Sequence, residues 1–123
     1  MTSLPNLCLA NRLLIEIPHM IIEMRTYVLH PGKAPDYLKL FEEEGYDIQV
    51  PIFGNLIGYF STEIGPINQI IHMWGFESHA ERDRRRAILQ SSPEWLAFVK
   101  KIRPLVQSQQ NAILKGASFS PIR

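Results

Sequence analysis

Residues 68–76 constrain the fold more than any other segment of this chain. They read Asn-Gln-Ile-Ile-His-Met-Trp-Gly-Phe, and their β-branched and aromatic side chains favour a strand. Successive strand side chains point to opposite faces, so one face is predicted to carry His72 and Trp74 between apolar residues, and the other Ile71 and Met73. A small domain covers one sheet face with its own helices. The second apolar face therefore predicts contact with another molecule.

Composition restricts the class of protein. With 123 residues, 46% of them hydrophobic, the chain is long enough for one ordinary globular core. Its formal net charge of +1 gives no broad electrostatic reason to bind nucleic acid or an anionic membrane. The single cysteine, Cys8, cannot form an internal disulfide, which fits a reducing compartment and predicts a cytoplasmic protein.

The first nineteen residues differ from the rest. Their Leu/Ile-rich run is interrupted by Asn11, Arg12 and Glu16, so it is a poor signal peptide and too short and polar for a membrane span. We expect residues 1–19 to form an irregular extension and residues 20–123 to form the domain. Met20 directly precedes the first strand, so we expect that translation can begin there.

The remaining sequence predicts six elements in the order strand, helix, strand, strand, helix, strand. Their expected positions are residues 21–29, 33 to 45 or 50, 56–64, 68–76, 78–104 with a restart at Ser92, and 107–114. Ser78 and Glu81 form a capping box, and Ser92-Pro93 is a second helix start. This order is the split βαβ pattern. It predicts an α+β fold with a four-stranded antiparallel sheet, the first and third strands central, and both helices on one face.

Several blocks of the sequence together resemble the NIPSNAP family, in this order and at the family's spacing. They are residues 20–27, 30–33, 54–60, 64–69, 72–74 and 118–121. The resemblance implies a ferredoxin-like domain of the dimeric α/β-barrel superfamily, in which the sheets of two subunits face each other. That superfamily holds cofactor-free monooxygenases, haem-degrading enzymes and non-catalytic binding proteins, so the resemblance implies a homodimer but no particular reaction.

The first strand supplies candidate site residues. We expect Ile22, Met24 and Val28 to pack beneath the helices, and Glu23, Arg25 and Tyr27 to face the helix-free side. We expect His72 and Trp74 of the third strand and Tyr59 of the second strand to lie beside them. A sheet-lined cavity between two subunits would then hold the predicted ligand-binding residues Glu23, Arg25, Tyr27, Tyr59, His72 and Trp74.

The chemistry of these residue types suggests a role for each of them. His72 is the candidate for proton transfer because an imidazole titrates near neutrality, and Arg25 can hold a carboxylate, enolate or phosphate by paired hydrogen bonds. Trp74 and Tyr27 would be flat apolar walls, and Tyr59 would add a hydroxyl. The alternative is structural: Glu23 and Arg25 simply form an ion pair, and His72 is a hydrogen-bonded core residue.

Other motifs are weak. Arg82 and Arg84 to Arg86 are interleaved with Glu81 and Asp83, which favours a solvated surface over a nucleic-acid site. The four histidines lack metal-ligand spacing, and no glycine-rich phosphate loop or dinucleotide fingerprint is present, so neither metal nor cofactor is expected.

Three functions remain open. The first is a cytoplasmic homodimer that binds a small organic anion without transforming it. The second is a cofactor-free oxygenase or isomerase that uses His72 and Arg25. The third is a protein-interaction module.

Overall fold

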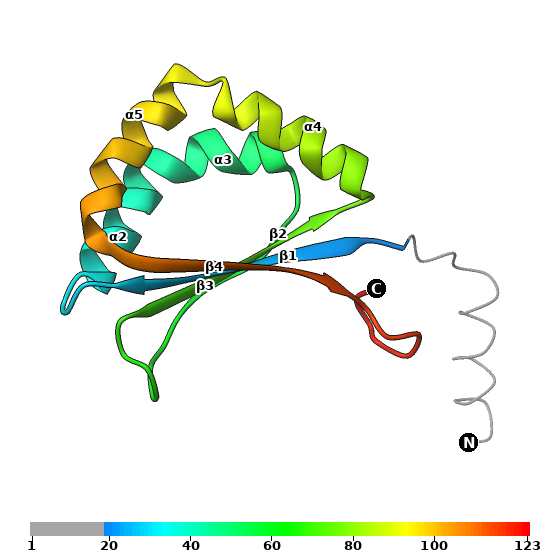
Figure 1. Ribbon diagram of the computed structural model, residues 1–123, viewed down its shortest axis with the longest axis horizontal. Coiled ribbons are helices and arrows are strands. Elements are labelled where there is room, and N and C mark those ends of the chain that lie inside the picture. The colour runs from blue at the N-terminus through cyan, green and yellow to red at the C-terminus, as the bar shows by residue number, and fades with distance from the viewer. Residues whose placement is uncertain (1–18) are drawn as a thin grey trace.

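The computed structural model describes residues 19–123, which form one sheet and a layer of helices (Figure 1). The strands are β1 (Ile21–Leu29), β2 (Leu56–Ser61), β3 (Gln69–Phe76) and β4 (Val106–Lys115). The helices are α2 (Ala34–Leu40), a π-helical turn (Phe41–Gly45), α3 (Tyr46–Phe53), α4 (His79–Gln90), α5 (Pro93–Ile102) and a 3₁₀ turn (Arg103–Leu105). The expected N-terminal extension, apart from its last residue, lies outside the described residues.

The sheet has the predicted topology. Its strand order is β2-β3-β1-β4, with every neighbouring pair antiparallel, so β1 and β3 occupy the centre. Arg25 of β1 lies opposite His72 of β3 and Asn111 of β4. All of the helices lie on one side of the sheet (Figure 1). The expected ferredoxin-like α+β fold is therefore confirmed.

The starts of α4 and α5 were also correctly predicted, but only half of the expected capping box forms, because the Glu81 carboxylate binds Arg84 and Arg85 instead of the backbone N–H of Ser78. The hydroxyl of Ser78 accepts a hydrogen bond from the backbone N–H of Glu81, and that of Ser92 accepts one from Trp95. These short-range bonds depend only on neighbouring residues, so the sequence is enough to identify them.

The first helical segment extends further than expected. A π-helical turn connects α2 to α3, and Pro51 lies inside α3 rather than at its end. The helix stops at Gly54, whose φ of 86° is readily adopted only by glycine. An alanine Cβ at Gly45, within the π turn, would lie 2.7 Å from atoms of Phe41 and Phe98, so this glycine permits close packing of α5.

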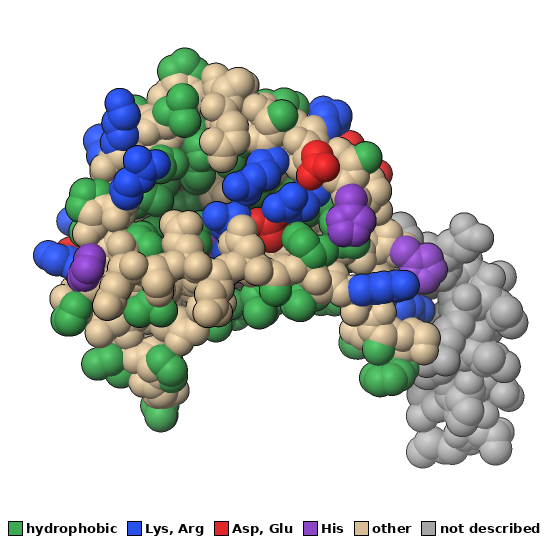
Figure 2. Space-filling model, viewed as in Figure 1, with side chains coloured by type: hydrophobic (Ala, Val, Ile, Leu, Met, Phe, Trp, Pro, Cys, Tyr) green, Lys and Arg blue, Asp and Glu red, His purple; other side chains and the backbone are tan. Residues whose placement is uncertain are grey.

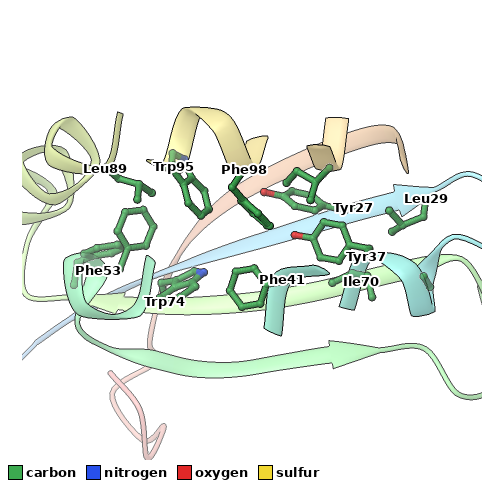
Figure 3. Close-up of a cluster of buried hydrophobic side chains, with 13 residues drawn as sticks. Tyr27, Leu29, Tyr37, Phe41, Phe53, Ile70, Trp74, Leu89, Trp95 and Phe98 are labelled. Atoms are coloured by element: carbon green, nitrogen blue, oxygen red, sulfur yellow. The ribbon is translucent and has the colours of Figure 1, made fainter. Parts of the chain in front are cut away.

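The hydrophobic core fills the space between the helices and the sheet. Figure 3 shows Tyr27 and Trp74 from the strands facing Phe41, Phe53, Trp95 and Phe98 from the helices. Phe53 meets the Trp74 ring edge to face at a centroid distance of 5.1 Å. The prediction that Trp74 lies on the helix-free side is thus wrong.

The same reversal applies to the whole face of β1. Glu23 and Tyr27 are buried on the helix-covered side, where Arg82 of α4 binds the Glu23 carboxylate. Met24 and Val28 instead lie on the helix-free side, where Val28 is exposed. The expectation failed because it placed the more apolar side of β1 under the helices, whereas arginine side chains from α4 compensate the buried charge.

The helix-free face is nevertheless apolar, as expected. The register places Met24 opposite Met73 and Ala112, and alternation adds Ile22, Val28, Ile71 and Leu114 to this face. The β2–β3 hairpin and the C-terminal segment both project on this side of the sheet (Figure 1). Within residues 19–123, no helix is long and apolar enough to cross a membrane.

Candidate functional site: an arginine-lined cavity

A cavity of about 500 Å³ lies between the sheet and the helical layer. Its walls come from β1 and β4 on one side and from α3, α4, α5 and the 3₁₀ turn on the other. Figure 2 looks onto this hollow, where several Lys and Arg side chains gather between the helices and the sheet. The cavity therefore belongs to a single subunit and lies on the opposite side of the sheet from the one predicted.

Positive charge dominates the lining of the cavity. Arg25, Arg86 and Arg103 contribute to its wall, and no described residue of the lining is acidic. Uncharged polar groups come from Gln49, Gln90, Gln107, Ser108 and Gln109. Such a surface favours an anion and disfavours a cation.

Arg25 is held firmly in place by its neighbours. Its Nη1 donates to Glu23 Oε2 at 2.7 Å, and its Nε donates to the Tyr27 hydroxyl at 2.9 Å. With its amide oxygen turned toward Arg25, Asn111 accepts a further bond from Nη1 at 2.9 Å. Burial alone would lower the pKa of Arg25, but Tyr27 and Glu23 raise it above the ordinary value, so the guanidinium stays charged. Among residues 19–123, no hydrogen bond uses Nη2 of Arg25.

Glu23 is the counter-charge beneath the arginines. Its side chain is fully buried, forms ion pairs with Arg25 and Arg82, and lies 3.9 Å from Arg86. Burial raises the pKa of Glu23, but the hydrogen bonds and charges of Arg82 and Arg25 outweigh it and lower the pKa below its usual value. One carboxylate thus faces three guanidinium groups. Asp83 supplies one more negative charge, bonded to Arg82 at 3.2 Å on the surface.

His72 belongs to an aromatic network next to the cavity. Its Nδ1 accepts a hydrogen bond from Trp74 Nε1 at 2.7 Å, and its ring stacks on Tyr59 at a centroid distance of 4.4 Å. Burial, assisted by the charge of Arg25, lowers the pKa of His72 to about 3. His72 is therefore neutral near pH 7, and it is not part of the cavity lining. The catalytic role of His72 stays a prediction that this geometry does not favour.

The predicted site residues thus lie together but divide into two groups. Arg25 and Tyr27 line the cavity, with Glu23 bonded to Arg25. Tyr59, His72 and Trp74 form the adjoining core, where the Tyr59 hydroxyl also bonds that of Tyr37 at 2.7 Å.

Sequence reasoning missed the contribution of the helices to the site. Within the cluster interpreted as a solvated surface, Arg82 and Arg86 both turn toward Glu23, whereas Arg84 and Arg85 bind Glu81. The spacing of four residues between Arg82 and Arg86 was an available signal, because it places both on one face of a helix. Arg103 and Gln49 had no comparable signal.

Known proteins of similar sequence place the chain in a family. A family model described as NIPSNAP matches residues 22–121. The Protein NipSnap homolog of Dictyostelium discoideum is 33% identical over 72% of this chain, and human Protein NipSnap homolog 3A is 30% identical over 74%. The matched segments make up 39% and 37% of those two proteins, so the chain spans less than half of either relative.

Solved structures give the same result. A NIPSNAP family protein from Agrobacterium tumefaciens has a TM-score of 0.82 at 50% identity, covering 85% of this chain and 100% of that one. An uncharacterized NIPSNAP-like domain protein from Burkholderia xenovorans has a TM-score of 0.82 at 52% identity, covering 85% and 91%. A putative antibiotic biosynthesis monooxygenase from Nitrosomonas europaea, with a TM-score of 0.62 at 7% identity over 89% and 99% of the two chains, shares the fold alone. On this evidence, the chain belongs to the NIPSNAP family.

Proposed function

We propose that this NIPSNAP protein binds a small organic anion in the cavity between its sheet and its helices. The observation that carries the proposal is the cavity lining, in which three arginines and no acidic residue occur among the described residues. Arg25 is held by Glu23 and Tyr27, so little side-chain freedom is lost when its guanidinium binds an oxyanion. A carboxylate matches the planar donors of arginine.

The rest of the lining supports a ligand with an apolar body. Phe53, Leu89, Trp95, Val99 and Ile102 face the cavity. Its volume of about 500 Å³ is in the range of small-molecule sites. An aromatic or medium-chain aliphatic acid fits both the charge and the size of the site.

Calorimetric titration of the whole chain tests the proposal. The probes are 3-phenylpropionate and hexanoate, each compared with its uncharged amide. We expect each acid to bind at least about 10-fold more tightly than its amide, because only the acid offers an anion to the arginines.

Matched variants locate the binding. The double substitution Arg86→Gln and Arg103→Gln removes two positive charges from the cavity lining and leaves the close ion pairs of Glu23 intact, because Arg86 lies 3.9 Å from the Glu23 carboxylate. It should weaken acid binding by about 10-fold or more. Arg84→Gln is the control, because Arg84 lies on the same helix but binds Glu81 on the surface. Failure of both acids to bind, equal binding of acids and amides, or equal losses in the double variant and the control would refute the proposal.

We also propose that the helix-free face pairs with the same face of a second copy. A four-stranded face with strands of about eight residues covers roughly 500 Å², below the roughly 800 Å² per partner of a standard interface. The projecting hairpin and C-terminal segment add apolar area on the same side, where Ile64 is 93% and Phe119 78% exposed.

The lone Cys8 supports the further proposal that this dimer works in the cytoplasm.

Sedimentation velocity tests the dimer. Met73→Asp places a charge at the centre of the helix-free face, so we expect it to convert a dimer into a monomer. Ile88→Asp is the matched control, because Ile88 is an exposed apolar residue of α4. A wild-type chain that sediments as a monomer at micromolar concentration would contradict the proposal, as would a Met73→Asp variant that remains dimeric.

A further inference from the structure

Gln49 is an exception in the buried stripe of its helix. Residues 41, 45, 49 and 53 follow one another at four-residue spacing and are all buried. The other three are Phe41, Gly45 and Phe53, which pack in the core. Gln49 is only 4% exposed, an unusual degree of burial for a glutamine.

The Gln49 amide has no partner within residues 19–123. None of their side-chain hydrogen bonds involves it, and its amide atoms are still open to solvent, because His72 Nε2 is the fully buried side-chain atom without a partner among these residues. The same side chain lines the arginine-rich cavity. Its donor and acceptor are therefore available to a molecule in that cavity.

Gln49 and Arg25 lie in different walls of the same cavity. Arg25 belongs to the strand side of the cavity, and Gln49 to the helix side on α3. Apolar side chains of α3, α4 and α5, namely Phe53, Leu89 and Trp95, converge in the same region (Figure 3). A π-helical turn directly precedes α3, and such turns often occur at functional sites.

We propose that the natural ligand is an apolar carboxylic acid with a hydroxyl group on the part of the molecule remote from its acid group, and that Gln49 recognises this hydroxyl. A hydroxyl both donates and accepts, so it can bond either end of the amide, whereas a purely hydrocarbon acid in the cavity covers the amide without giving it a partner. This inference rests on the proposed anion-binding function and adds a specificity-determining residue to it.

The test measures selectivity rather than affinity alone. Calorimetry compares 3-phenylpropionate with its 2-, 3- and 4-hydroxyphenyl analogues, so the hydroxyl samples three positions around the ring. We expect wild-type protein to bind at least one hydroxylated isomer about 10-fold more tightly than the parent acid. Gln49→Met, which has a similar shape but no amide, should bind that isomer and the parent acid equally. Gln49→Leu repeats the comparison with a second apolar side chain, and thermal unfolding confirms that each variant is folded.

The outcomes separate this inference from the function on which it rests. The inference is refuted if the wild type binds the acids without preferring any hydroxylated isomer. It is also refuted if both variants keep the preference, because Gln49 then does not recognise the hydroxyl. If the wild type binds none of the acids, the anion-binding function itself fails. A general loss of packing would weaken all of the acids together and leave their ratio unchanged.

Discussion

Replacing Glu23 with glutamine tests the electrostatics beneath the cavity. The Glu23 side chain is fully buried and bonded to Arg25 and Arg82, whose side chains are 12% and 19% exposed. Removing one partner of a buried ion pair costs about 3–5 kcal/mol because it leaves the other charge uncompensated. Water can reach part of both arginines, so we expect Glu23→Gln to lower the free energy of unfolding by about 3 kcal/mol.

Urea denaturation followed by tryptophan fluorescence measures this loss. Trp74 and Trp95 are both buried and report on the core, and urea does not screen charges as guanidinium salts do. We expect a lower midpoint at an unchanged slope, and a fall in Tm of roughly 12 °C for a domain of this size. Glu44→Gln is the control. It removes a carboxylate that binds Lys101 on the surface, and should cost less than about 1 kcal/mol.

The pH dependence supplies an independent signature of the same carboxylate. The pKa of Glu23 is lower in the folded protein than the ordinary value of 4.5, so the unfolded chain takes up a proton at a higher pH than the folded chain does. The stability due to this charge is therefore complete above about pH 4.5 and is lost as the pH falls through the lowered folded pKa. The difference between wild type and Glu23→Gln should narrow below that pH. A Glu23→Gln variant as stable as Glu44→Gln, or a difference that does not change with pH, would refute the reasoning.

Two further predictions concern packing and a buried imidazole. His72 has a folded pKa of about 3 against an ordinary value of 6.5, so the free energy of unfolding of the wild type should fall as the pH drops from 6.5 toward 3. In a series of urea denaturations, His72→Gln should flatten this slope between pH 6.5 and 5. Equal slopes in the two proteins would show that His72 is not the titrating group. Gly45→Ala introduces a Cβ that is 2.7 Å from Phe41 and Phe98, so it should cost about 1–3 kcal/mol in the same assay, and an unchanged midpoint would contradict the proposed close packing.

The parts of the fold that depend on neighbouring residues could be predicted from the sequence. Ser78 and Ser92 cap helices through bonds to residues three positions away, and β4 follows the expected segment closely. The strand order followed from the order of elements and the handedness of crossovers. None of these features requires knowledge of side chains that are distant in sequence.

The orientation of β1 could not be predicted in the same way. Both of its faces mix apolar and polar residues, and the choice between them depends on Arg82, 59 residues away from Glu23. The π turn was equally hidden. In a regular α-helix, residues spaced by four are rotated by about 40° from one another, so they gradually leave the buried face. Only the structure, in which Gly45 lies close to Phe98, shows that the wider π turn keeps these residues on the buried face.

Only those residues of the candidate site that lie on strands were predicted from the sequence. Arg25 and Tyr27 were recognised because one strand presents them side by side, whereas Arg103 and Gln49 come from separate helical segments. A lone glutamine among apolar positions is visible in the sequence, but its significance depends on the cavity in front of it.

Met24 and Arg25 are consecutive in the chain yet point to opposite sides of the sheet, one toward the apolar outer face and the other into the cavity. Inserting or deleting a single residue in β1 before Met24 would exchange the faces of the residues that follow, turning the Arg25 guanidinium outward and Met24 inward. Insertions in the β2–β3 connection, by contrast, leave this alternation intact. Length changes in the central strand should therefore abolish the proposed ligand binding and the proposed subunit pairing together, although point substitutions can alter each of them separately.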